Sequence, residues 1–166
     1  PRFWYFPNGK KAVVIMTDSA SDVPESLIDK LNVHCVPLRL SFGEKDYLDK
    51  VGLSTQDFYQ KLRTEIVFPK TSQTSTGDFR RQFEFLLSHH PQVVYVGISR
   101  AISGTLQSAE AAASRGHANR IHVFDTANVA AGQGLLVIAA AEAANAGKSA
   151  TEIIAELETL RPMVKM

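Results

Sequence analysis

The sequence contains a single cysteine, Cys35, among its 166 residues. One thiol excludes an internal disulfide and any metal site built from several cysteines. The five histidines show no zinc-ligand spacing, so we expect no bound metal. Long hydrophobic runs are also missing, since the longest, around 134–141, is too short to span a bilayer. We therefore predict neither a metalloprotein nor an integral membrane protein.

The sequence also lacks an excess of charge of either sign. The 18 basic and 17 acidic residues leave a formal net charge of +1, and no basic stripe with interleaved aromatic residues occurs. Nucleic acid is therefore a poor candidate for the partner. The first ten residues lack the apolar core of a secretion signal, so we expect a cytoplasmic protein.

The chain does have a strong apolar fraction, 45%, which favours one packed domain. Strand-length apolar runs alternate with helical patterns, which predicts an α/β fold with a parallel sheet and right-handed crossovers. The expected strands cover 12–17, 33–40, 93–98 and 121–125, and the expected helices cover 24–32, 54–64, 79–88, 129–146 and 149–160, with one more starting after Ser103. We expect 41–50 to be rich in turns and 68–78 to be irregular.

Three polar loops follow the predicted strands, at 17–21, 99–105 and 125–128. In parallel sheets, ligands bind beyond the carboxyl ends of the strands, so these loops should converge on a site. The loop with Ser103, Gly104 and Thr105 opens a helix, whose unpaired N–H groups attract anions. The same hydroxyls could simply cap that helix, and judged without further information capping is favoured.

Five short motifs occur in order along the chain and are together similar to the DegV family. They are Thr17-Asp18-Ser19-Ala20-Ser21-Asp22-Val23-Pro24, Val36-Pro37-Leu38, Lys70-Thr71-Ser72-Gln73-Thr74-Ser75, Ser103-Gly104-Thr105-Leu106-Gln107-Ser108-Ala109, and Asp125-Thr126 followed by Gly132-Gln133-Gly134-Leu135-Leu136. Each motif alone is weak, but five in register make chance a poor explanation.

The resemblance implies an α/β, parallel-sheet, Rossmann-like three-layer domain. Residues 11–166 would be the N-terminal domain of a longer protein whose second lobe is largely absent from this chain. Residues 1–10 would be an N-terminal extension or linker. Members of this family bind a long-chain fatty acid between two α/β domains and need no cofactor. The resemblance therefore implies a lipid-binding carrier rather than an enzyme.

In bacteria, DegV-like proteins serve as the acyl-carrying subunit of fatty acid kinase. The catalytic subunit, or a fused kinase domain, converts the bound carboxyl group to an acyl phosphate for phospholipid synthesis. The resemblance therefore implies two partners for this chain, a long-chain fatty acid and a kinase.

The resemblance also implies site residues. Thr71 and Ser103 would hydrogen-bond the fatty-acid carboxylate, and Ser72, Gly104 and Thr105 would complete the lipid-binding loops. Secondary contacts are expected from Asp18, Ser19 and Arg100. Without the family, Thr71 and Ser72 would be interpreted as ordinary loop hydroxyls, and Arg100 as a solvent-exposed side chain.

Two positions depart from the family pattern. Thr74 stands where a proline is common, which predicts a less rigid loop around Thr71. Lys50 stands where a glycine is common, which disfavours a left-handed backbone at that position.

Two other functions remain open at this stage. An α/β phosphotransferase or phosphosugar-binding enzyme would hold phosphate at the Ser103 helix and Mg²⁺ on Asp18, although Gly104 is not followed by the Gly-Lys-Ser of a phosphate-binding loop. Alternatively, a lipid-free interaction module would use the hydroxyl loops only for structure. A well-packed face without an apolar groove would favour this module, whereas the fatty-acid hypothesis requires such a groove, with Thr71 and Ser103 meeting at one end.

Overall fold

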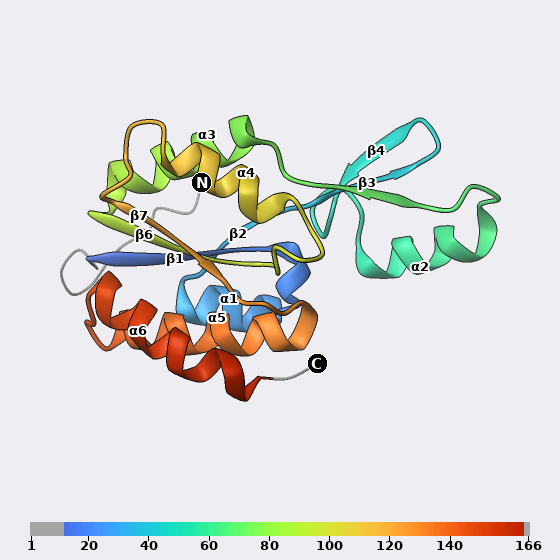
Figure 1. Cartoon of the computed structure of the whole chain (residues 1–166). Helices are drawn as coiled ribbons and strands as arrows, with labels where there is room; N and C mark the ends of the chain where they lie inside the picture. The colour runs from blue at the N-terminus through green and yellow to red at the C-terminus, as the bar shows by residue number, and fades with distance from the viewer. Residues whose placement is uncertain (1–11, 165–166) are drawn as a thin grey trace.

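The computed structural model describes residues 12–164. The predicted extension at 1–10 lies outside the described residues. Figure 1 shows a layered body from which a smaller arm projects. Within the described part of the chain, no helix is both long enough and apolar enough to cross a membrane.

The body is built on a four-stranded parallel sheet in the order β2-β1-β6-β7. Its strands are β1 (Val13–Asp18), β2 (His34–Val36), β6 (Gln92–Gly97) and β7 (Ile121–Asp125). The two central strands are almost wholly buried, because helices cover both faces of the sheet.

Alternate residues of the central strands enter two separate cores. Val13 and Ile15 pack with α5 (Ala130–Asn145) and α6 (Ala150–Leu160), which lie with α1 (Glu25–Leu31) on one face. Val14 and Met16 pack with α3 (Thr76–His89) and α4 (Thr105–Ala113) on the other face. The period-two alternation of side chains along a strand therefore produces the predicted three layers.

The arm is a second, antiparallel sheet in the order β4-β3-β5, with α2 (Thr55–Thr64) packed against it (Figure 1). Its strands are β3 (Arg39–Phe42), β4 (Lys45–Leu48) and β5 (Lys70–Ser72). Among residues 12–164, its own core consists of Leu40, Phe42 and Leu53, with Tyr47 and Phe58 partly buried beside them.

The arm corrects three predictions. The single strand expected at 33–40 is wrong: the chain leaves the parallel sheet after Val36 and enters the second sheet at Arg39. Pro37 lies between the two strands, and its lack of an N–H interrupts a backbone ladder. The turn-rich 41–50 and irregular 68–78 segments contain β4 and β5. Helix α3 also starts three residues earlier than predicted, because Ser75 accepts the N–H of Asp78 and caps it.

Candidate functional site

The three predicted loops meet at the carboxyl edge of the parallel sheet. The N–H of Ile98 donates to Asp18 Oδ2 at 3.0 Å, which joins the loop after β6 to the end of β1. The N–H of Ser99 donates to the carbonyl of Asn128 at 2.9 Å, which joins it to the loop after β7. Convergence of these loops is therefore confirmed.

Asp18 lies at the centre of this edge but faces inward. Its Oδ2 accepts from Tyr95 Oη at 2.7 Å and Gln133 Nε2 at 3.1 Å, besides Ile98, and its Oδ1 accepts from the N–H of Ala20. Burial raises the pKa of the Asp18 carboxyl, while these hydrogen bonds favour its charged form. Asp18 therefore organises the core, and its oxygens already have protein partners.

Ser19 also has an internal role. Its side chain is buried, and its Oγ accepts the N–H of Leu38 at 3.0 Å, which links the 3₁₀ turn η1 (Ser19–Ser21) to the start of the arm. Both secondary candidates, Asp18 and Ser19, therefore already bond to the protein itself, and Ser19 also lines a cleft beside this edge.

Ser103 and Thr105, here called the hydroxyl pair, stand at the start of α4. Ser103 Oγ accepts the N–H of Thr105 at 3.2 Å, and its contact with Thr105 Oγ1 is 3.0 Å long. Thr105 is fully buried, whereas Ser103 is half-buried. Gly104, the N-cap residue, offers no side-chain bond. Ser103 therefore bonds the first N–H of its helix, although Gly104 is the N-cap residue.

Thr71 and Ser72 lie on β5, at the edge of the arm, and both are exposed. Thr71 pairs with Leu40 and therefore shares the face of the arm sheet that carries Leu40 and Tyr47. Ser72 lies on the opposite face, because side chains alternate along a strand. The two hydroxyls cannot both face one ligand atom.

Thr74 forms a side-chain hydrogen bond that a proline at this position could not form. Its side chain is buried, and its Oγ1 donates to the carbonyl of Pro37 at 3.3 Å. The loosening expected from the missing proline is therefore offset by a hydrogen bond to the junction between β2 and β3.

Gln73 brings the Thr71 segment to the start of α4. Its Nε2 donates to Ser108 Oγ at 3.3 Å. A Cβ built on Gly104 would lie only 1.9 Å from Gln73 Oε1, so the amide fills the space above this glycine. Gln73 was not among the predicted site residues, and its contact is what places the segments of Thr71 and Ser103 side by side.

Arg100 lies on the rim of the edge, half exposed. Its guanidinium pairs with Glu110 at 2.5 Å and with Asp125 at 3.6 Å. The two carboxylates largely offset its charge, which favours the solvent-exposed interpretation over a direct ligand contact.

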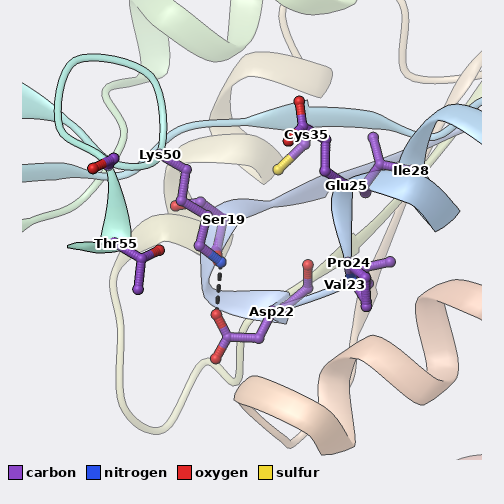
Figure 2. A pocket seen from close by; sticks show the side chains of 11 residues that line it. Ser19, Asp22, Val23, Pro24, Glu25, Ile28, Cys35, Lys50 and Thr55 are labelled. Atoms are coloured by element: carbon purple, nitrogen blue, oxygen red, sulfur yellow. Dashed lines mark hydrogen bonds and ion pairs between the residues drawn. The ribbon is translucent and has the colours of Figure 1, made fainter.

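A cleft of about 460 Å³ lies beside this edge, between the η1–α1 turn and the start of α2 (Figure 2). Neither Thr71 nor Ser103 lines it. Lys50 does, and its Nζ donates to the Ser19 carbonyl at 2.9 Å and to Asp22 Oδ1 at 2.6 Å. Lys50 has a φ of 61°, so the expectation that lysine would avoid the left-handed conformation here is wrong.

Cys35 also lines the cleft and is partly buried rather than part of the core. Burial, reinforced by the nearby charge of Asp18, raises the pKa of its thiol to about 12. The thiol is therefore protonated at neutral pH and is a poor nucleophile.

A family model described as "Uncharacterised protein, DegV family" matches residues 12–166. Among curated proteins, a DegV domain-containing protein of Caldanaerobacter subterraneus is 37% identical over 153 residues, which are 92% of this chain and 54% of the relative. The DegV protein of Bacillus subtilis is 30% identical over 154 residues, 92% of this chain and 55% of the relative. The chain thus spans about half the length of the curated relatives it matches.

Solved structures with similar folds include two DegV proteins and a third protein, all of which bind fatty acids. One is a DegV family protein from Thermus thermophilus, with 37% identity and a TM-score of 0.83, covering 91% of this chain and 54% of that one. The other is DegV from Bacillus subtilis, with 30% identity, a TM-score of 0.85 and the same two coverages. A stearic-acid-binding protein from Eubacterium ventriosum has 30% identity and a TM-score of 0.78, covering 87% of this chain and 51% of that one.

Proposed function

The chain belongs to the DegV family, and on that premise we propose that it supplies the carboxylate-binding lobe of a site for a long-chain fatty acid. Thr71 and Ser103 hydrogen-bond the carboxylate, with Ser72, Gly104 and Thr105 shaping the surrounding loops. The observation that carries the proposal is the Gln73 contact, which brings the exposed Thr71 strand beside the half-buried Ser103.

The hydroxyl pair suits a carboxylate. A hydroxyl has one proton to donate, and either oxygen of the pair can accept from the other. Ser103 Oγ donates to Thr105 Oγ1 at 3.0 Å, and rotation of this hydroxyl would redirect its proton to a ligand oxygen. Buried Thr105 then supports Ser103 without touching the ligand.

The acyl chain, rather than the hydroxyls, sets the affinity. Each buried methylene is worth about 0.8 kcal/mol, so a tail of about sixteen carbons gains roughly 11 kcal/mol before entropic losses. A neutral hydroxyl donor adds about 1 kcal/mol net. Thr71 and Ser103 therefore fix the register of the lipid and the position of its carboxyl group.

The protein acts as a carrier rather than an enzyme. The side chains gathered at the proposed head-group site are hydroxyls and an amide, which hold a carboxylate without attacking it. A kinase, as a separate catalytic subunit or a fused domain, would phosphorylate the carboxyl group held there, and the acyl phosphate would enter phospholipid synthesis. We place this handover in the cytoplasm.

The alternative, a phosphate-binding enzyme with Mg²⁺ on Asp18, has less support. Both Asp18 oxygens accept hydrogen bonds within a buried network. Among residues 12–164, no group of three or more His, Cys, Asp or Glu side chains is arranged to hold a metal ion.

Organic extraction and mass spectrometry of the complete gene product, purified from its native host, test the proposal. We expect stoichiometric fatty acid in the wild type, and an affinity for added palmitate that falls about tenfold or more in Thr71→Ala/Ser103→Ala. Thr159→Ala/Ser114→Ala, which removes one exposed hydroxyl on α6 and one at the C-cap of α4, is the matched control and should bind normally. A lipid-free protein that also takes up neither palmitate nor oleate would refute the proposal.

A further inference from the structure

We propose that Gln73 is a positioning residue that sets the distance between Thr71 and Ser103. The inference rests on the proposed function and extends it to a residue that need not touch the fatty acid. Gln73 acts as a clasp, because its amide joins the edge of the arm to the start of α4. Thr71 lies two residues before Gln73, and Ser103 lies one residue before Gly104.

The clasp has two halves, both on one face of α4. Gly104 and Ser108 are four residues apart, so they lie one above the other on the helix surface. Gln73 Oε1 occupies the space where a side chain at 104 would begin, and Gln73 Nε2 donates to the buried Ser108 Oγ. The need for glycine at 104 is a need for space and not for a special backbone conformation, since any residue can adopt its φ of −72°.

The position of Thr71 relative to α4 depends on this clasp, while other bonds hold the arm to the rest of the body, among them the one from Arg39 Nη2 on β3 to Asp78 Oδ2 on α3 at 3.1 Å. β5 is an edge strand of three exposed residues, paired only with β3. No strand pairing joins the arm sheet to the parallel sheet within the described part of the chain. Thr74 anchors the segment to Pro37, on the side of β2. The contacts of Gln73 with Gly104 and Ser108 fix the Thr71 segment relative to α4, and hence relative to Ser103.

Two substitutions break the clasp from opposite sides. Gln73→Ala removes the amide from an exposed position, where the fold should tolerate the loss. Gly104→Ala places a methyl group where Oε1 lies, and the far end of the flexible glutamine side chain must swing away. In the double variant the added methyl group meets no amide, so the two losses should not add.

The experiment measures palmitate affinity of the complete gene product as a double-mutant cycle, with Gln107→Ala as the control. Gln107 is an exposed glutamine on the same helix. We expect each single variant to raise Kd about three- to tenfold, the double variant to match the weaker single, and Gln107→Ala to bind normally. Circular dichroism confirms that each variant is folded.

A second readout separates positioning from a general structural role. The carboxyl ¹³C signal of bound [1-¹³C]palmitate reports the pKa of the ligand carboxyl, which well-placed hydroxyl donors lower. Gln73→Ala should raise that pKa, and loosening elsewhere in the fold should not.

The outcomes are distinct. Additive losses in the cycle, or an unchanged Kd and carboxyl pKa in a Gln73→Ala protein that binds palmitate, overturn the clasp and leave the proposed function standing. A wild-type protein that takes up no fatty acid overturns both.

Discussion

At the scale of the residue, Lys50 shows how a side chain can hold its own backbone in an unfavourable conformation. Its φ of 61° lies in the left-handed region, which costs a non-glycine residue about 1–2 kcal/mol. In return, Nζ reaches the Ser19 carbonyl and Asp22 across the cleft shown in Figure 2. The ion pair is well exposed, so it contributes at most about 1 kcal/mol.

This balance predicts which of two variants has the greater stability against unfolding. Lys50→Met loses both Nζ contacts and keeps the strained backbone, whereas Lys50→Gly loses the contacts and relieves the strain. We therefore expect Lys50→Gly to be more stable than Lys50→Met by about 1 kcal/mol in urea unfolding. Equal stability of the two variants, or a more stable Lys50→Met, would contradict the interpretation.

At the scale of the element, α5 approaches the η1 turn at a glycine. A Cβ on Gly134 would lie 2.6 Å from the backbone carbonyl oxygen of Ser21, and a backbone atom cannot swing aside as a side chain can. The Gly132-Gln133-Gly134 motif is therefore a place where α5 packs closely against its neighbour. The approach also allows Gln133 to reach Asp18.

Gly134→Ala should therefore destabilise the fold despite the higher helix propensity of alanine. Overpacking costs about 1–3 kcal/mol and the propensity returns up to about 1, so we expect a net loss of about 1–2 kcal/mol. Leu135→Ala, at the neighbouring exposed position of α5, is the control and should change the free energy of unfolding by less than about 1 kcal/mol. A Gly134→Ala protein as stable as the wild type would show that α5 has room to shift.

The elements that the sequence predicted well are those buried on both faces. The runs expected at 12–17 and 93–98 match β1 and β6 within one residue, because continuous apolar strands are typical of parallel sheets. The arm strands were missed because each has only three or four residues, and every residue of β5 is exposed. Their pairing joins Leu40 to Thr71, and no local pattern reveals so distant a partner.

Of the candidate site, the sequence correctly predicted that the loops after β1, β6 and β7 converge. The resemblance predicted Thr71 and Ser103, and the loop path brings their segments together. It could not reveal that Asp18 turns inward, since that depends on Tyr95 and Gln133, which lie far along the chain. Gln73 was missed because its role depends on the space above Gly104, which exists only in the folded chain.

At the scale of the whole molecule, the arm exposes apolar side chains that a packed domain would cover. The segment between α2 and β5 lies at the tip of the arm, far from the parallel sheet (Figure 1). There Ile66 is 102% exposed, Phe68 79% and Val67 51%. Contiguous exposed apolar residues of this kind mark surfaces that associate with a partner.

The 166-residue chain on its own should therefore self-associate through the arm tip. We expect it to sediment as dimers or larger species at a protein concentration where Ile66→Ser/Phe68→Ser remains monomeric, because each serine removes apolar area from the contact. Leu135→Ser, which changes one exposed leucine on α5, should sediment like the wild type. If the Ile66→Ser/Phe68→Ser variant associates as strongly as the wild type, the arm tip is not the contact and another surface must be sought.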